Sequence, residues 1–307
     1  SSLFTHLSTM KKFLMIIFTM YLLLYIVGFV IPQKTTHPVL ERLSKPVTIA
    51  HQGGNKVYPD ESLLAFTKAV DMGIQVLEMD IHRTRDGVIV INHDQAIDRL
   101  TDSSGLIWEM SWLELQEVDG AYNWSPDGLT YPYRGKGVKI LSLNTVLDSF
   151  PKQVYDIEIK QHDPPLEKDL CDLLRKYGVA ADQTIVASFR DETLARFHDI
   201  CPEVAISLPV NQGTILYVLS RIGLERLLPL DAVVAQLPTT FSTKLGQLEL
   251  DRRYIEAFAK RDRQVWVWTV NDLIEMKRLV NMGAHGIITD RPDILMDFIH
   301  HSEEDAN

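Results

Sequence analysis

The chain has 307 residues, a formal net charge of -10 and 46% hydrophobic residues. Such a chain suits one large globular domain with an appendage. The net charge is negative, and the sequence has no cluster of basic residues that could bind nucleic-acid phosphates. Both features argue against a nucleic-acid partner. The sequence does not define an oligomeric state.

The first feature along the chain is a nearly continuous apolar run at residues 13–31. About 20 such residues span a bilayer, so the run predicts a transmembrane helix or signal anchor. A cleavable signal peptide is the competing interpretation, but no A-x-A-like cleavage site follows the run. We therefore expect an N-terminal tail at 1–12, a single-pass membrane helix and a linker at 32–45.

The flanking charges leave the orientation of this helix open. Lys11 and Lys12 precede it, whereas Lys34, Arg42 and Lys45 follow it, so the positive-inside rule gives no clean answer. Our expectation is a cytoplasmic N-terminus and a following domain on the non-cytoplasmic side.

From Val47 onward, apolar strand-like runs alternate with helical patterns, which is typical of β/α units in a parallel sheet. Eight strands are expected, the number that closes a TIM (β/α)8 barrel. We predict this barrel over residues 46–300, followed by an acidic tail at 301–307. The expected strands are Val47–Ala50, Val76–Ile81, Val154–Ile159, Thr184–Phe189, Val204–Leu208, Ala232–Leu237, Val265–Val270 and Gly286–Thr289.

Three of the intervening helices have recognisable starts and stops. Asp60-Glu61-Ser62 leads into an apolar-periodic segment that stops at Gly73. The helix predicted at Leu166–Tyr177 stops at Gly178, and that at Asp272–Met282 stops at Gly283. Cys171 and Cys201 lie on or near helices and are too few for a disulfide framework, so we interpret both as packing thiols.

The segment from Glu78 to Asp94 predicts a β-hairpin that leaves the barrel after its second strand. Glu78 and Asp80 are two residues apart and project from one face of a strand. The turn chemistry at Asp86-Gly87 brings His93 roughly opposite Asp80. An exposed ribbon with solvated charges is the ordinary interpretation of two such carboxylates.

Other polar groups favour a shared site over that interpretation. His51 and Gln52 follow the first strand, while Glu158 and Lys160 alternate with Asp156 along the third. In a TIM barrel, the strand ends that carry such groups form the active site.

The types of these residues indicate phosphoryl chemistry. Glu78, Asp80 and Glu158 offer oxygen ligands that suit one divalent cation, Mg²⁺ or Ca²⁺, which would polarise a phosphate. Lys160 supplies a further positive contact. His51 and His93 are the side chains best suited to acid–base catalysis near neutral pH.

The segment at 120–139 is rich in glycine, proline and aromatic residues and predicts a long loop. Its aromatic side chains are candidates for contact with an acyl chain or the lipid interface, and a self-packed surface loop is the alternative. The aromatic residues concerned are Tyr122, Trp124, Tyr131 and Tyr133.

Taken together, these motifs resemble the glycerophosphodiester phosphodiesterase family. The matching pieces are His51-Gln52-Gly53, Pro59-Asp60-Glu61-Ser62, Glu78-Met79-Asp80, Asp86-Gly87, His93-Asp94, Glu158-Ile159-Lys160, Val267–Asp272 and Gly286–Pro292. The resemblance implies a TIM barrel that uses a divalent metal to hydrolyse a phosphodiester. It also implies metal ligation by the three acids, acid–base roles for the two histidines, a phosphate contact at Lys160 and a substrate-pocket wall at Trp268.

The apolar anchor and the aromatic insertion look most similar to the membrane-tethered, lysophospholipase D-like branch of this family. That branch implies a lysophospholipid substrate, which yields a head-group alcohol and lysophosphatidic acid.

Two positions depart from the family pattern. Gln52 stands where the family usually has Arg, and Asp60 stands where it has Glu. Gln retains hydrogen-bonding capacity but lacks the guanidinium charge, so we list Gln52 as a substrate contact and hypothesise that Arg134 or Lys136 partly replaces the charge.

Two other functions compete with hydrolysis. One is a membrane-tethered pseudoenzyme that binds lipid head groups without turnover, which the loss of Arg at position 52 suggests. The other is a sphingomyelinase D-like phosphodiesterase that forms a cyclic phosphate.

Overall fold

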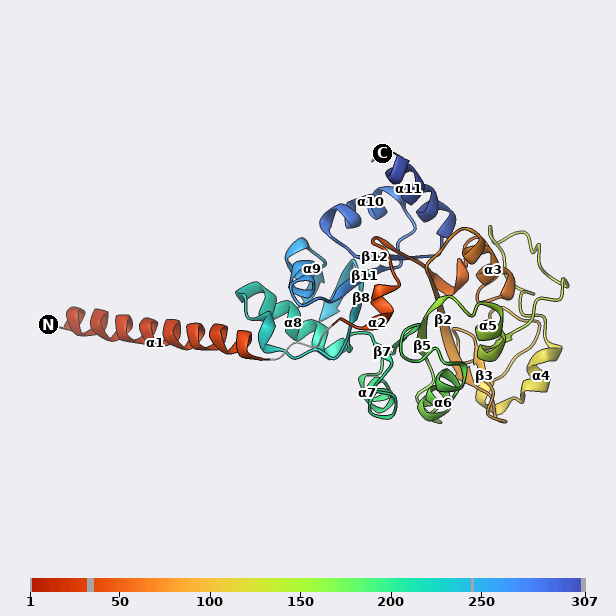
Figure 1. Cartoon of the computed structure of the whole chain (residues 1–307), viewed down its shortest axis with the longest axis horizontal. Helices are drawn as coiled ribbons and strands as arrows, with labels where there is room; N and C mark the ends of the chain where they lie inside the picture. The colour runs from red at the N-terminus through yellow and green to blue at the C-terminus, as the bar shows by residue number, and fades with distance from the viewer. Residues whose placement is uncertain (1, 32–35, 244–245, 305–307) are drawn as a thin grey trace.

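Eight parallel strands close into a barrel within the residues that the computed structural model describes, 2–31, 36–243 and 246–304 (Figure 1). Their order around the barrel is β7-β6-β5-β2-β1-β12-β11-β8, and a parallel bridge between Ser207 and Val234 joins the two ends. The predicted TIM barrel is therefore confirmed. The barrel strands are β1 (Val47–Ala50), β2 (Val76–Arg83), β5 (Val154–Ile159), β6 (Thr184–Ala187), β7 (Ala205–Ile206), β8 (Val234–Pro238), β11 (Gln264–Trp268) and β12 (Gly286–Thr289).

Helices cover the outside of the barrel, with ends where the sequence predicts them. Ser62 caps the helix after β1 by accepting a hydrogen bond from the Ala65 N–H, and Gly178 and Gly283 end two others in the left-handed conformation. The helices are α1 (Ser2–Val30), α2 (Pro38–Glu41), α3 (Leu63–Asp71), α4 (Trp112–Glu117), α5 (Leu143–Ser149), α6 (Glu167–Tyr177), α7 (Asp191–Ile200), α8 (Val210–Ile222), α9 (Arg252–Ala259), α10 (Leu273–Met282) and α11 (Pro292–Glu304). Short 3₁₀ helices are η1 (His51–Gly53), η2 (Ile107–Glu109) and η3 (Glu225–Leu227).

The predicted hairpin extends β2 beyond the barrel. β2 pairs antiparallel with β3 (Ile89–Ile91), which in turn pairs with β4 (Leu141–Ser142). A second small sheet, from β9 (Thr240–Thr243) and β10 (Gly246–Glu249), follows β8.

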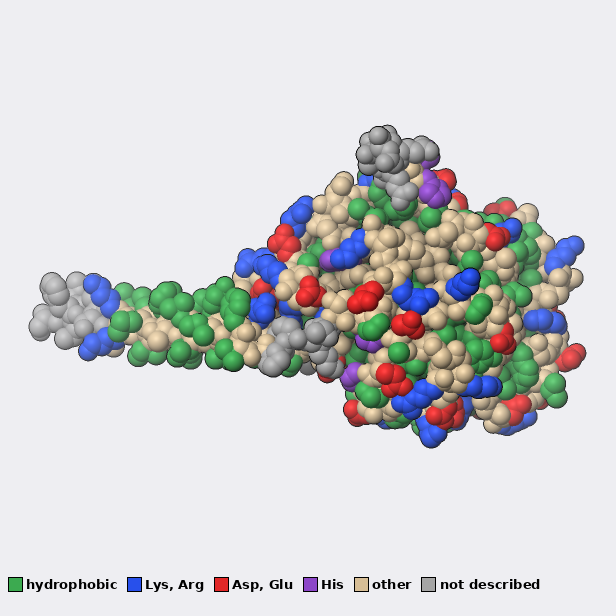
Figure 2. All heavy atoms as spheres, in the orientation of Figure 1, with side chains coloured by type: hydrophobic (Ala, Val, Ile, Leu, Met, Phe, Trp, Pro, Cys, Tyr) green, Lys and Arg blue, Asp and Glu red, His purple; other side chains and the backbone are tan. Residues whose placement is uncertain are grey.

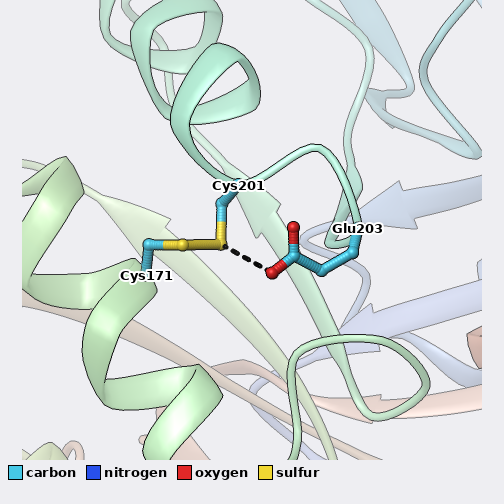
Figure 3. Close-up of side chains that lie close together, drawn as sticks. All are labelled: Cys171, Cys201 and Glu203. Carbon is cyan, nitrogen blue, oxygen red and sulfur yellow. Dashed lines mark hydrogen bonds between the residues drawn. A yellow bond between two sulfur atoms is a disulfide. The ribbon is translucent and has the colours of Figure 1, made fainter.

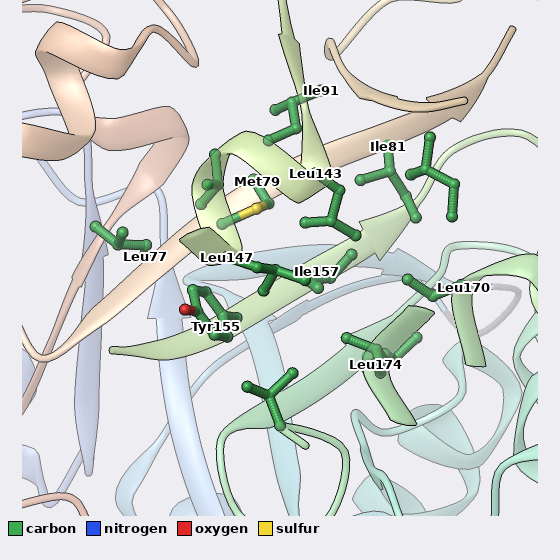
Figure 4. Close-up of a cluster of buried hydrophobic side chains, with 14 of the residues drawn as sticks. Leu77, Met79, Ile81, Ile91, Leu143, Leu147, Tyr155, Ile157, Leu170 and Leu174 are labelled. Carbon is green, nitrogen blue, oxygen red and sulfur yellow. The ribbon is translucent and has the colours of Figure 1, made fainter. Parts of the chain in front are cut away.

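The main core lies between the barrel wall and its helices (Figure 4). Leu77, Met79 and Ile81 project from the outer face of β2 toward these helices, together with Tyr155 and Ile157 of β5. Alternation along each strand leaves the intervening residues, the acids among them, to face the barrel interior. The same pattern that builds the core therefore also places the polar groups.

A separate apolar cluster fills the amino-terminal end of the barrel. Trp266 is fully buried there among Val47 and Ile49, and Val39 and Leu40 of α2 pack against the same cluster. Part of the predicted linker at 32–45 is thus a short helix that seals this end of the barrel.

The interpretation of the two cysteines as packing thiols is wrong. Cys171 on α6 and Cys201 at the end of α7 form a disulfide bond instead of serving as packing thiols (Figure 3). Both are fully buried, and α6 and α7 pack side by side around β5 and β6. The pairing was missed because the two cysteines are 30 residues apart and meet only through the packing of α6 on α7.

Helix α1 projects from the barrel with apolar side chains all around it (Figures 1 and 2). Its segment Thr9–Val30 is long and apolar enough to cross a membrane, and only 6% of its most apolar window is buried. A signal sequence at the N-terminus has the same character.

The predicted loop at 120–139 contains no helix or strand and lies at the side of the barrel away from α1 (Figure 1). Trp124 is buried, and its indole N–H donates to the Asn55 carbonyl oxygen at 3.0 Å. Tyr133 packs edge-on against Trp124. Trp124 and Tyr133 therefore pack within the protein, whereas Tyr122 and Tyr131 are 36% and 40% exposed.

Candidate active site

The carboxylates meet because β2 and β5 are neighbouring parallel strands. Asp80 and Glu158 are directly paired in register, and Glu78 lies one inward position below Asp80. Ligand oxygens of these three side chains all lie within 4.8 Å of one another. The structure thus brings together the three acids that the sequence singled out.

Burial makes this acidic cluster electrostatically costly. Glu78 and Asp80 are buried, and burial together with the charge of Asp80 raises the pKa of Glu78 and of Glu158. The ammonium of Lys160 lies 2.9 Å from Glu158 and 3.1 Å from Asp80, which offsets part of the repulsion. Its own pKa is raised by these two carboxylates against the effect of burial.

The cluster fits a hard divalent cation. Among the described residues, Asp80 Oδ1 accepts no well-aligned hydrogen bond, although the Lys160 ammonium lies 3.1 Å away. Three clustered carboxylates with a free acceptor position are the ligand set that Mg²⁺ and Ca²⁺ use.

His51 follows β1 directly and reaches the cavity from η1. Its Nδ1 lies 2.6 Å from Asp290 Oδ1, and Asn271 donates to the other oxygen of Asp290 at 2.8 Å. Burial disfavours a charged ring, but Glu78 and Asp290 outweigh it and raise the pKa of His51 to about 9. Since Nδ1 is engaged, Nε2 is the ring nitrogen available to a substrate.

His93 lies one residue further along the hairpin than its predicted place opposite Asp80. The residue paired with Asp80 is Asn92, whose N–H donates to the Asp80 carbonyl oxygen. His93 follows the end of β3 and lines the same cavity as His51. Its Nδ1 lies 3.0 Å from Asp94 Oδ1, so each histidine has a carboxylate partner.

The Asp94 partner is itself held in place. The guanidinium of Arg99 donates to Asp94 Oδ2 at 2.5 Å and to Asp60 at 2.8 Å. Although burial opposes it, Arg99 lowers the pKa of Asp94, which keeps the carboxylate charged beside His93.

Gln52 does not line the cavity, and it donates hydrogen bonds to two of the acids. Its backbone N–H donates to Glu78 at 2.8 Å and its side-chain amide to Asp80 at 2.9 Å. Asn55 donates to its amide oxygen. A neutral amide thus orients two of the candidate ligands.

The cavity at this end of the barrel has a volume of about 290 Å³ and two unlike walls. One part of its lining carries both histidines with Glu78 and Glu158, and Asp80 lies buried behind them. The other carries apolar side chains, with the rings of Phe189 and Trp268 edge-to-face at 5.7 Å. The apolar lining residues are Ala187, Phe189, Leu208, Val210, Trp268 and Ile288.

The structure does not bring Arg134 to this cavity. Its guanidinium stacks between Tyr122 and Tyr131, 4.2 Å and 4.0 Å from the ring centroids. It also donates to the Tyr122 carbonyl oxygen. Neither Arg134 nor Lys136 lines the cavity described here.

Three acids near the site were not assigned roles from the sequence. Asp290, directly after β12, could have been found by the same strand-end rule that located His51. Asp156 is buried inside the barrel, where Gln236 donates to both of its oxygens, and burial raises its pKa to about 7. Glu61, at φ 54°, accepts a hydrogen bond from the Asp80 N–H at 2.7 Å, and it lies in the Pro59–Ser62 motif, which gave it no role.

Comparisons with known proteins agree with this geometry. Residues 51–294 match the model of the Glycerophosphoryl diester phosphodiesterase family, and the chain belongs to that family. It is 29% identical over 253 residues to a putative glycerophosphodiester phosphodiesterase of Bacillus subtilis, covering 81% of this chain and 96% of the relative. It is 27% identical over 270 residues to the human protein named Lysophospholipase D GDPD1, covering 82% of this chain and 85% of the relative.

Solved structures share the fold. A glycerophosphoryl diester phosphodiesterase domain from Mycobacterium tuberculosis superposes with a TM-score of 0.73 at 18% identity, covering 84% of this chain and all of the other. A phosphodiesterase of Oleispira antarctica, solved with the product sn-glycerol-3-phosphate, has a TM-score of 0.67 at 21% identity, covering 83% of this chain and 97% of the other. Family membership makes this chain a phosphodiesterase of the glycerophosphodiester class, as the motifs indicated.

Proposed function

We propose that the protein hydrolyses glycerophosphodiesters or lysophospholipids and releases a head-group alcohol together with glycerol phosphate or lysophosphatidic acid. One observation carries this proposal. Three clustered carboxylates and two histidines, each held by its own carboxylate, converge on one cavity. A site that only binds a head group has no evident need for two such histidines.

Glu78, Asp80 and Glu158 would hold one divalent cation, Mg²⁺ or Ca²⁺. Such an ion polarises a phosphoryl oxygen and offsets the negative charge that develops on it. Lys160 lies within the same cluster and presents its ammonium to the cavity, where it would contact a phosphate oxygen.

The histidines would divide the proton transfers. His93 takes a proton from the attacking water, and the water oxygen forms the new bond to phosphorus. His51 is charged at neutral pH and gives its Nε2 proton to the leaving oxygen as the phosphorus–oxygen bond breaks. Asp290 and Asp94 orient the two rings, and Asp290 stabilises the charged form of His51.

The apolar wall supports a substrate that carries an acyl chain. Phe189, Leu208 and Trp268 line the same cavity as the acids, so a phosphate held by the acidic cluster leaves its organic substituent near apolar surface. The human relative is named a lysophospholipase D, which agrees with this assignment.

We also propose that the barrel lies on the non-cytoplasmic side of the membrane, with α1 as a single-pass anchor. The buried Cys171–Cys201 disulfide supports this placement because such bonds persist in oxidising compartments.

Product analysis by mass spectrometry tests the function. The wild-type chain and the variants His51→Ala and Glu78→Ala are each given glycerophosphodiesters and lysophospholipids with Mg²⁺ or Ca²⁺. We expect release of free head-group alcohol by the wild type, abolished by EDTA and by both substitutions.

Three results would contradict the proposal. Binding without turnover would assign a pseudoenzyme, a cyclic phosphate product would assign the sphingomyelinase D-like chemistry, and equal turnover by all three chains would overturn the site.

A further inference from the structure

Helix α8 differs from its neighbours on the outside of the barrel in what it exposes. Its solvent face carries Ile215, Val218 and Ile222, which are 48%, 42% and 51% exposed. Their spacing of three and four residues places them on one side of the helix. By contrast, α6 exposes Lys168, Asp172 and Arg175 on its outer face.

Few charges interrupt this apolar stripe, defined here as Ile215, Val218 and Ile222. Arg221 is the single charged residue of α8, all of which the structure describes, and it is held by Asp251 and by the ring of Tyr217. A contiguous apolar surface on a barrel helix usually marks a contact site.

The position of α1 identifies what covers the stripe. The Tyr21 hydroxyl donates to the Ile222 carbonyl oxygen at 2.9 Å, so α1 meets the C-terminal end of α8. Further along α1, Gly28 packs against Arg226 of η3, whose guanidinium lies 4.8 Å from the Phe29 ring centroid.

These contacts also set the depth of α8 relative to the span. Nine residues separate Tyr21 from Val30, which is about 13 Å of helix. Tyr21 lies 12 residues after Thr9, so if Thr9–Val30 crosses the bilayer, Ile222 lies level with the middle of that span. Lys and Arg side chains gather on the barrel surface beside α1, where anionic phosphates would lie (Figure 2).

The other end of α8 reaches the active-site cavity. Val210, the first residue of α8, lines that cavity together with Leu208. The helix therefore runs about 18 Å from the cavity mouth to its contact with α1.

We propose that α8 contacts the bilayer that α1 enters, with the stripe against lipid, and that an amphiphilic phosphodiester passes from the bilayer along α8 into the cavity. The second part rests on the proposed function. Because Ile222 lies level with the middle of the α1 span, the C-terminal end of α8 meets the hydrocarbon of the bilayer. Leu208 and Val210 continue the apolar surface from the stripe to Phe189 and Trp268.

Fluorescence quenching tests the contact with lipid directly. The full chain is reconstituted in vesicles of brominated phosphatidylcholine, with Val218→Trp compared with Leu113→Trp on α4, where Leu113 is 75% exposed at the opposite end of the molecule. We expect the bromine atoms to quench the tryptophan introduced at 218 and not the one introduced at 113, after subtraction of the wild-type signal. Equal quenching at the two positions would overturn the proposal.

Kinetics test the passage of substrate. Ile215→Asp and Val218→Asp should lower kcat/KM for lysophosphatidylcholine in vesicles by about tenfold or more, because each removes a buried aliphatic contact. Turnover of water-soluble glycerophosphocholine should not change, and Leu113→Asp should alter neither rate. Loss of both activities, or of neither, would contradict the proposal.

Two outcomes separate this inference from its alternatives. Should the wild-type chain release choline from neither substrate, the proposed hydrolysis fails while the quenching result still decides the position of α8. A dimer that dissociates on Val218→Asp would assign the stripe to a second copy of the chain and would overturn the lipid contact.

Discussion

The two ends of the barrel are built from the same eight strands but have opposite character. At the carboxyl end, acids, histidines and a lysine surround a cavity. At the amino end, Trp266 and the residues around it form a closed apolar cluster that α2 covers. Alternation along a strand fixes which side chains point inward at both ends, but only the carboxyl end leaves room for a ligand.

This contrast suggests that the carboxyl end of the barrel serves catalysis and the amino end serves stability. The carboxyl end concentrates buried charge and like-charged pairs, which cost stability and serve chemistry. The amino end supplies apolar burial and serves stability. The predictions below separate the two by asking which substitutions change activity and which change the free energy of unfolding.

The largest effect is expected from the removal of a proton donor at the carboxyl end. His51→Ala should lower kcat by about 10²–10⁴-fold, the usual contribution of a general acid or base. A kcat within threefold of wild type, measured by choline release, would remove His51 from the mechanism.

At the amino end, Leu40→Ala should lower the free energy of unfolding by about 2–3 kcal/mol because it opens a cavity beneath α2. Chemical denaturation measures this loss, and Leu113→Ala at an exposed position is the matched control. Activity of the folded variant should stay at the wild-type level. A large drop in kcat without loss of stability would contradict the claim that the amino end contributes to stability and not to catalysis.

His285 makes the amino end sensitive to pH. It is buried, which lowers its pKa from 6.5 to about 4, and its Nδ1 accepts a hydrogen bond from the Val265 N–H. Because the unfolded chain binds a proton first, stability is complete above pH 6.5 and is lost as the pH falls toward 4. We expect His285 to account for about 1–2 kcal/mol of this loss.

The measurement compares wild type with His285→Asn, which keeps an acceptor but cannot titrate. Denaturation at pH 7 and pH 5 should show a smaller drop in the variant. Equal drops in both chains would show that another group is responsible.

The apolar wall should matter for lipids alone. Trp268→Ala should raise the KM for lysophosphatidylcholine about tenfold, the value of one well-buried aromatic contact, with little change for glycerophosphocholine. Trp268→Phe should recover most of the affinity. Equal changes for the two substrates would mean that Trp268 positions the phosphate instead.

The smallest effect is expected at Arg134. Its guanidinium is held between two tyrosine rings of its own loop, so Arg134→Ala should change KM and kcat by less than about twofold. Choline release at several substrate concentrations checks this. A large increase in KM would restore the hypothesis that Arg134 replaces the guanidinium absent at position 52.

The sequence was most informative where periodicity applies. Apolar runs and stop signals located the eight strands, because burial on both faces of a barrel strand leaves a plain pattern. The same rule placed Glu78, Asp80 and Glu158 on inward positions, and their proximity followed from the fold.

The sequence predictions failed where a feature depends on the geometry between two segments of the chain. The hairpin turn uses three residues, Arg85 to Gly87, so the Asn92 pairing lies one residue from the predicted register. The Cys171–Cys201 bond and the stacking of Arg134 depend on packing between elements or within an aperiodic loop, for which a single sequence carries no pattern.

The most direct test of the central claim is a calorimetric titration of the full chain with Mg²⁺ and with Ca²⁺. We predict one site per chain, lost in both Glu78→Gln and Glu158→Gln, because β2 and β5 must each contribute a carboxylate. Binding that survives both substitutions, or no binding by the wild type, would contradict the account.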